Sequence, residues 1–299
     1  GMEACLVNLL EPGDRVLVLV NGVFATRLRE IATRLGAEVD SLEFPWGTPV
    51  LLEPLRERLR QRSYKLLAMV HAETSTGVRN PAAEVGALLK GSDTLYVLDT
   101  VTSLGGIEVN VDGWGVDALY SCSQKCLSCP PGLAPVSFSP RAVDTLRARK
   151  SKVPNWYLDV SLIANYWEVH KRAYHHTAPI NMLYALYQGL LLVLEEGQEA
   201  VFARHRRVHE ELVAGLESLG LRLIVEPPHR LPMLNAVSVP AGVDDAQERA
   251  RLREQFKIEV GAGLGALAGK IWRIGLMGAS ARRENVDDCL KALAAVLGK

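Results

Sequence analysis

The sequence has no net charge, because its 34 lysine and arginine residues balance 34 aspartate and glutamate residues. The bulk electrostatic attraction behind non-specific nucleic-acid binding is therefore missing, and no nucleic-acid partner is expected. A long apolar run is also missing. The longest apolar stretch, Ile180 to Leu194, is interrupted by Asn181 and Gln188 and falls short of the ~18 apolar residues of a membrane span. No membrane partner is expected either.

Cysteine is scarce, with five residues in 299. This odd and small number argues against a disulfide scaffold and favours a reducing compartment. We recognise no secretory leader, and the sequence ends in Leu297-Gly298-Lys299 rather than the Ser-Lys-Leu of a peroxisomal signal. A cytoplasmic location is the expectation.

The composition, 48% hydrophobic and 23% charged, is typical of a globular protein, and the length suggests about two domains. Apolar runs of strand length alternate with helical patterns in the first part. We predict strands at 15–20, 65–71 and 95–99, and helices at 2–10, 24–35 and 51–62, with a further helix that Asn80 caps and Pro81 begins. This alternation predicts an α/β fold, a mostly parallel central sheet with helices on both faces.

The pattern changes toward the C-terminus. Short strands are predicted at 118–121 and 134–138, followed by helical spacing over 180–219 with a break near Gly197. The last part mixes strands at 221–225, 235–239 and 271–276 with helices at 245–256 and 283–297. We expect a large domain over residues 1–198 and a smaller C-terminal α+β domain over residues 199–299.

Two residues are candidates for chemistry. Asp99 ends an apolar strand, and ligands of open α/β sheets bind at the carboxyl ends of strands; a turn or helix cap is the alternative. Lys125 follows the next strand in a segment without other charges, where a shielded amine becomes a nucleophile for carbonyls; its alternative is a lysine that reaches the surface. This pairing is what a pyridoxal-phosphate enzyme needs, a Schiff-base lysine and a carboxylate for the pyridine nitrogen.

Five motifs together resemble one family of such enzymes. They are His71-Ala-Glu-Thr-Ser-Thr-Gly-Val78, Asp99-Thr-Val-Thr-Ser-Leu-Gly-Gly106, Ser121-Cys-Ser-Gln-Lys125, Tyr174-His-His-Thr177 and Trp272-Arg-Ile-Gly-Leu-Met-Gly278. In this order they resemble the alanine–glyoxylate and serine–pyruvate aminotransferases, class V aminotransferases of fold type I, from one end of the sequence to the other. In that family a further stretch with a phosphate-binding turn precedes the point that matches Gly1. We therefore expect the large domain to be N-terminally incomplete.

The resemblance implies roles at the cofactor ring. Lys125 matches the Schiff-base lysine, and Asp99 matches the partner of the pyridine nitrogen. Val101 would pack on one face of the ring. Phe24 stands where the family usually has a tryptophan that stacks on the other face, so stacking is kept and an indole N–H is lost.

The resemblance also implies contacts around the ring. Thr74 matches a hydroxyl residue near the cofactor, and Gln124 matches a contact on the phosphate side. Tyr174 and Thr177 resemble the pair that reaches the phosphate from the other subunit, which would make a homodimer necessary. Arg273 matches the residue that binds the substrate carboxylate, a task for which a bidentate guanidinium is suited.

The implied activity is transamination between a small amino acid, alanine or serine, and glyoxylate or pyruvate, with ping-pong kinetics through Lys125. Two alternatives stay open. One is another class V activity such as cysteine desulfuration, and the other is an inactive or weakly cofactor-binding fragment.

Three further patterns carry no site of their own. The cluster Cys122, Cys126 and Cys129 has no second pair of ligands, so no metal is expected. His205 and His209 share a segment with three arginines, which favours a solvated basic face. The glycine-rich segment 261–269 precedes a strand rather than a helix, which favours a loop near the substrate over a dinucleotide site.

Overall fold

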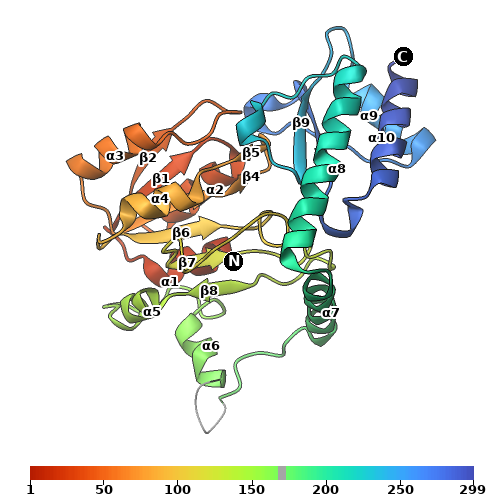
Figure 1. Ribbon diagram of the computed structural model, residues 1–299. Coiled ribbons are helices and arrows are strands. Elements are labelled where there is room, and N and C mark those ends of the chain that lie inside the picture. The colour runs from red at the N-terminus through yellow and green to blue at the C-terminus, as the bar shows by residue number, and fades with distance from the viewer. Residues whose placement is uncertain (168–172) are drawn as a thin grey trace.

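The computed structural model describes residues 1–167 and 173–299, and they contain a large and a small sheet (Figure 1). The large sheet has the strand order β2-β1-β3-β6-β7-β8, and its neighbours are parallel except for the antiparallel pair β7 and β8. Its strands are β1 Arg15–Val20, β2 Glu38–Glu43, β3 Leu66–Val70, β6 Leu95–Asp99, β7 Ala118–Tyr120 and β8 Val136–Phe138. The predicted parallel sheet is confirmed.

The small sheet is antiparallel, with the order β10-β11-β9. It consists of β9 Leu234–Ser238, β10 Gly261–Ala262 and β11 Ile271–Gly275. A third pair, β4 Ala72–Glu73 and β5 Val78–Arg79, follows β3 directly and faces the junction between the two sheets.

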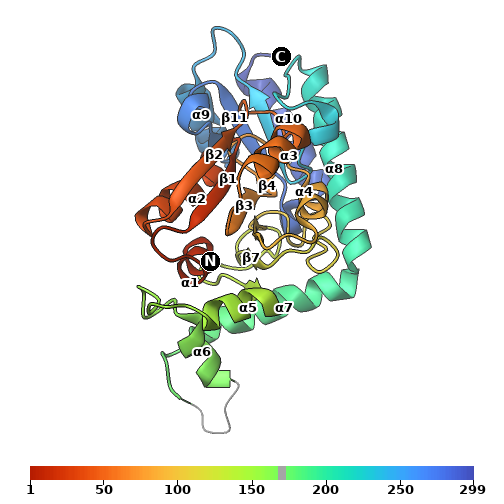
Figure 2. The ribbon, with the colours of Figure 1, turned by 90° about the vertical axis from the view of Figure 1, so that its left-hand side faces the viewer.

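Helices cover both faces of the large sheet. On one face lie α1 Met2–Leu9, α2 Val23–Arg34 and α5 Pro140–Arg147; on the other lie α3 Leu52–Gln61 and α4 Ala82–Leu89. The remaining helices are α6 Val160–Trp167, α7 Ile180–Glu196, α8 Gln198–Ser218, α9 Asp245–Phe256 and α10 Arg283–Val296. Figure 2 shows α7 running beneath the large sheet and α8 rising beside the small one.

The apolar run of β1 is explained by burial on both faces. Val16 and Val18 pack in the core formed with α1 and α2, whereas Leu17 and Leu19 pack in the core formed with α3 and α4. Side chains of a strand alternate between faces, so a strand covered on both sides needs no polar residue.

Two local predictions are wrong, and one strand was not predicted. The segment 221–225 is no strand, because it pairs at one bridge, Leu223 with Val237, before the chain turns at Pro227. The edge strand β2 was not predicted, because its sequence is largely polar and gives no apolar run. The strand is only half-buried. Asn80 does not cap α4, which begins after Pro81. Its amide instead bonds to Asn21 and to the backbone of Val50 and Val70.

The prediction that His205 and His209 lie on a solvated basic face of α8 is also wrong. His205 and His209 are buried, whereas Arg206 and Arg207 are exposed. The two histidines are four residues apart and therefore share one face of the helix. That face packs on the small sheet, where His209 Nδ1 lies 2.7 Å from Asn235 Oδ1.

The close approach of α4 to Trp114 yields a stability prediction. A Cβ at Gly86 would lie 1.9 Å from the backbone oxygen of Trp114. Gly86→Ala should therefore lower the free energy of unfolding by about 2–3 kcal/mol, although alanine is the better helix former. The exposed neighbour offers a control, because Ala87→Gly should cost only the ~1 kcal/mol of helix propensity. Urea unfolding measures both variants, and a stabilised Gly86→Ala protein would contradict the packing described.

Candidate active site

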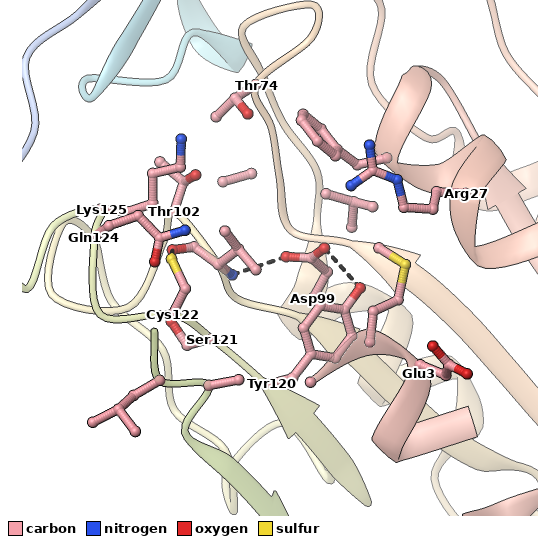
Figure 3. Close-up of a pocket in the computed structure, with 18 of the residues that line it drawn as sticks. Glu3, Arg27, Thr74, Asp99, Thr102, Tyr120, Ser121, Cys122, Gln124 and Lys125 are labelled. Carbon is pink, nitrogen blue, oxygen red and sulfur yellow. Dashed lines mark hydrogen bonds between the residues drawn. The ribbon is translucent and has the colours of Figure 1, made fainter. Parts of the chain in front are cut away.

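A cavity of about 590 Å³ lies at the carboxyl ends of β3, β6 and β7. Most of the residues predicted for the cofactor line it, namely Phe24, Thr74, Asp99, Val101, Gln124 and Lys125. In Figure 3, Lys125 and Gln124 approach from the turn after β7, Arg27 approaches from the opposite side, and Asp99 lies between them. The structure therefore brings these residues together, as expected for the switch-point edge of a parallel sheet.

Asp99 is buried at the end of β6 with both carboxylate oxygens engaged. Oδ1 accepts the N–H of Val101 at 2.8 Å, and Oδ2 accepts the hydroxyl of Tyr120 at 2.7 Å (Figure 3). Burial raises the pKa of Asp99 to about 7, while the hydrogen bond from Tyr120 opposes this rise. A buried carboxylate of this kind is stabilised by any cationic N–H donor placed in the cavity.

Tyr120 is a site residue that the sequence reasoning missed. It lies on β7 directly opposite Asp99 in the parallel register, so both side chains leave the sheet on the same face. Burial raises the pKa of Tyr120 well above its usual value, which keeps the hydroxyl protonated and able to donate to Asp99.

Lys125 lies in a tight turn that follows β7. Its carbonyl accepts the N–H of Ser128 at 3.0 Å, and the N–H of Cys129 bonds to the carbonyl of Ser123 at 3.0 Å. The lysine is half-buried and lines the cavity rather than reaching the open surface. Gln124, beside it, is more exposed.

The N-terminus of α2 forms the wall that carries Phe24. The cap residue Gly22 has no side chain, and the caps come instead from β4 and the turn after it. Glu73 Oε2 accepts the N–H of Ala25 at 3.1 Å, and Ser75 Oγ accepts the N–H of Val23 at 2.9 Å. A buried carboxylate at a helix N-terminus is favoured by the helix dipole. Glu73 thus positions α2, and sequence reasoning did not identify it.

Arg27, another missed residue, stands one turn along α2. Its guanidinium carbon lies 5.3 Å from the centroid of the Phe24 ring, and its charge opposes the rise in the pKa of Asp99. It is therefore a cationic group on the cavity wall beside the predicted stacking residue.

Arg273, on β11 of the small sheet, does not itself line this cavity but contacts Thr74, which does. Its Nε donates to the carbonyl of Ala262 at 2.7 Å, and Nη1 donates to the carbonyl of Thr74 at 3.3 Å. Burial lowers the pKa of this guanidinium and the charge of Glu73 raises it. Two backbone contacts thus direct Arg273 toward the segment that lines the cavity.

Tyr174 and Thr177 do not line the cavity of their own chain. The Tyr174 hydroxyl lies 2.7 Å from Thr177 Oγ1, and the tyrosine is 73% exposed. The structure thus keeps the pair together, on the segment that precedes α7.

The thiols of Cys122, which lines the cavity, and of Cys126 contact backbone carbonyls. Cys122 Sγ lies 3.6 Å from the carbonyl oxygen of Val101, and Cys126 Sγ lies 3.1 Å from that of Thr102. Burial raises the pKa of the Cys126 thiol to about 12, so the reactive thiolate is scarce at neutral pH. Within residues 1–167 and 173–299, no group of three or more potential metal ligands occurs.

The lining fits pyridoxal phosphate. The cavity offers a lysine amine, a buried carboxylate for a ring nitrogen, and Phe24 and Val101 as apolar contacts for a ring. The first residues of α1 also line it, and helix N-termini bind phosphate through free N–H groups.

None of the helices in the described parts of the chain is long and apolar enough to cross a membrane.

The pKa of Asp99 makes a pH-dependent stability prediction. Asp99 holds its proton more tightly in the folded chain, with a pKa of about 7, than in the unfolded chain, with a pKa of about 3.9. Its contribution to the free energy of unfolding therefore falls as the pH rises from about 4 to about 7. Asp99→Asn abolishes this fall. Between pH 4 and pH 8, the free energy of unfolding of the cofactor-free variant should therefore rise relative to that of the wild type by up to about 4 kcal/mol.

Urea unfolding of both proteins across this range measures the difference. Burial lowers the pKa of His71 to about 3, so the contribution of His71 falls as the pH drops below about 6.5. This opposite trend is common to both proteins and cancels in the difference. A difference that does not change with pH would contradict the assignment to Asp99.

Comparison with known proteins agrees with this geometry. Residues 2–287 match the family model for aminotransferase class V. The chain is 41% identical to (S)-ureidoglycine–glyoxylate transaminase of Bacillus subtilis, over 99% of this chain and 76% of that protein. It is 43% identical to alanine–glyoxylate aminotransferase of Callithrix jacchus, over 98% of this chain and 72% of that protein.

A solved structure leads to the same family. The crystal structure of alanine–glyoxylate aminotransferase from Nostoc sp. superimposes with a TM-score of 0.96 at 50% identity, over 99% of this chain and 78% of that one. The chain therefore belongs to the class V aminotransferases, pyridoxal-phosphate-dependent enzymes of fold type I.

Proposed function

We propose that the chain transfers an amino group from a small amino acid, alanine or serine, to glyoxylate or pyruvate. The observation that carries this proposal is the single cavity that Lys125 and the buried Asp99 both line, with Arg273 bonded to the backbone of a third lining residue, Thr74. Both curated relatives named above carry glyoxylate in their names, which favours glyoxylate as the acceptor.

Pyridoxal phosphate, when bound, supplies an aldehyde that condenses with amines and a ring that withdraws electrons from the substrate α-carbon. Asp99 accepts a hydrogen bond from the ring nitrogen and holds a proton there, while Tyr120 and Val101 keep the carboxylate oriented. Phe24 and Val101 line the cavity and would contact the ring. Lys125 removes the proton from the α-carbon and returns it to the cofactor side as a general base and acid.

Around the ring, Thr74, Gln124 and the first turn of α1 hold the polar substituents, and Arg27 adds a positive charge. Arg273 binds the substrate carboxylate with the guanidinium edge that its backbone contacts leave available. Because one site serves the donor and then the acceptor, ping-pong kinetics follow.

We also propose a homodimer in which Tyr174 and Thr177 reach the cofactor phosphate of the partner. The exposed residues of α7 support it: Ile180, Leu183, Tyr184, Tyr187, Leu190 and Leu194 share one apolar face of the helix, which follows this pair in the chain. Monomeric proteins rarely expose apolar patches of this kind, and obligate interfaces are built from them.

Two organisational features complete the proposal. We place the boundary between a large cofactor domain and a small domain at residues 198 and 199, where Gly197 separates α7 from α8. All five cysteines, which lie in the described part of the chain, are unpaired. Unpaired thiols fit a reducing compartment, so a cytoplasmic location is the one we propose.

Covalent trapping tests the role of Lys125. Mixing the purified chain with pyridoxal phosphate should give a visible absorption band, and borohydride should then fix the cofactor on Lys125, as mass spectrometry of peptides reads out. Lys125→Ala should lose both signals, whereas Lys270→Ala, which removes an exposed lysine outside the cavity, should keep them. Absence of a trapped adduct in the wild type would favour the alternative of an inactive or weakly binding fragment.

A substrate panel tests the reaction. Alanine and serine should each convert the cofactor to its amine form, and glyoxylate or pyruvate should restore the aldehyde form with parallel-line kinetics. Cysteine serves as the control for desulfuration. Because the thiols beside Lys125 are buried and protonated, sulfide release should be absent; release of sulfide without a keto acid would reverse the ranking of the two activities.

The α7 surface predicts the state of assembly. Light scattering should give twice the chain mass of 32.7 kDa for the wild type. Tyr187→Asp places a charge on the exposed face of α7 and should shift the protein toward the monomer and weaken cofactor uptake. Phe256→Asp, at an exposed aromatic residue at the end of α9, is the matched control and should change neither. A monomeric wild type that takes up the cofactor fully would refute the shared site.

A further inference from the structure

Ser128 has an unusual backbone conformation three residues after Lys125. In the described parts of the chain, the only non-glycine residues with positive φ are Ser128 and Lys257, both at 58°. Lys257 ends α9 as a left-handed C-cap, which is an ordinary place for this conformation. Ser128 ends no helix, so the surrounding contacts must hold it there.

Those contacts join Ser128 to the turn that follows β11. The Ser128 hydroxyl accepts the N–H of Ala279 at 2.7 Å, while the Ser128 N–H closes the lysine turn on the carbonyl of Lys125. The turn at Gly278–Ser280 directly follows the strand that carries Arg273. Ser128 thus connects the turn that contains Lys125 to the turn that follows the strand of Arg273.

Gly278 lets the two turns approach. A Cβ at this position would lie 1.9 Å from Ser128 Oγ and 2.6 Å from the carbonyl oxygen of Cys126, and the residue has a φ of 55°. Both the close contacts around this residue and its positive φ therefore require glycine.

The N-terminal part of α8 holds Gly278 from the other side. Gly278 N–H donates to His205 Nε2 at 2.9 Å, and the Gly278 carbonyl accepts Arg204 Nη1 at 2.7 Å. Glu196, the last residue of α7, orients Arg204 through two contacts of 2.6 and 2.8 Å.

The tautomer of His205 follows from its two partners. Its Nδ1 lies 2.8 Å from the carbonyl of Val201, so Nδ1 carries the proton and Nε2 is free to accept. The ring is completely buried, and burial lowers the pKa of His205, which keeps the ring neutral. The unprotonated Nε2 therefore accepts a hydrogen bond from the Gly278 N–H.

We propose that Ser128, Gly278, Arg204 and His205 form a clamp that positions Lys125 relative to Arg273. This inference rests on the proposed roles of those two residues. Proton transfer at the α-carbon needs the amine within hydrogen-bond reach of a substrate whose carboxylate Arg273 holds, and small errors in such an alignment are costly. The clamp fixes the two backbone segments against each other, and its members are positioning residues.

Ser128→Gly tests the clamp with little strain of its own. Glycine adopts the same backbone conformation freely, so the variant removes the side chain whose hydroxyl accepts the N–H of Ala279 without straining the turn. Ser280→Ala is the matched control, because the Ser280 hydroxyl lies in the same turn but contacts only Met277 and not the lysine turn. Gly278→Ala is a second variant, which forces the two turns apart.

Three measurements compare these variants with the wild type. The first is hydrogen–deuterium exchange of peptides covering residues 122–129 in the cofactor-free chain, which should rise in Ser128→Gly and Gly278→Ala only. The second is the pH midpoint of the visible band of bound pyridoxal phosphate, which should shift by about half a unit or more. The third is steady-state kinetics, in which kcat should fall about tenfold with KM changed far less.

The outcomes separate the clamp from the proposed function. Exchange that matches the Ser280→Ala control overturns the clamp. Faster exchange with an unchanged pH midpoint and kcat reduces it to a structural contact and overturns the positioning role. If the wild type takes up no cofactor, the proposed function fails, and the exchange measurement alone judges whether the clamp exists.

Discussion

The buried carboxylate of Asp99 is the constraint around which the site is organised. An ionised group in an apolar interior is costly unless hydrogen bonds or opposite charges compensate it. Compensation here comes from the neighbouring strand through Tyr120 and from the turn after β6 through the N–H of Val101. The Tyr120 contact depends on the parallel register of β6 and β7, whereas the Val101 contact is local to the turn, so a shift of register would change the electrostatics of the cavity.

A second buried carboxylate extends this arrangement across the cavity. Glu73 receives N–H groups from the start of α2, and its charge acts on both Asp99 and Arg273. One residue therefore acts both on the start of α2, which carries Phe24, and on the charge of Arg273. Two cationic residues, Lys125 and Arg27, line the cavity itself.

The sequence predicted the parts of the fold that local patterns encode. β1 and β6 were foreseen with their bounds because a strand buried on both faces is a continuous apolar run, and α9 because its residues are helix formers without glycine or proline. The polar edge strand β2 has no such signal. The buried face of α8 was misjudged because exposed arginines alternate with inward histidines, and the charges dominated the interpretation.

The site residues, too, were predicted where a local pattern marks them and missed where only the folded chain brings them together. Asp99 and Lys125 were identified since each ends or follows a strand, and motifs pointed to most of their neighbours. Tyr120 and Glu73 were missed because their importance comes from the partner opposite them, and neither strand register nor helix docking can be read from spacing. The contact of Arg273 with Thr74 joins residues 199 positions apart, which only the folded chain reveals.

The amide pair Asn21 and Asn80 has a consequence for how the cavity behaves as the proton concentration changes. Their side chains bond to each other and to the backbone of Val70 and Thr48, tying together the loops beyond β1 and β3. Amides do not ionise, so these ties keep the same strength whether Asp99 is protonated or not. Protonation of Asp99 therefore changes the charge of the cavity without changing these ties between the loops.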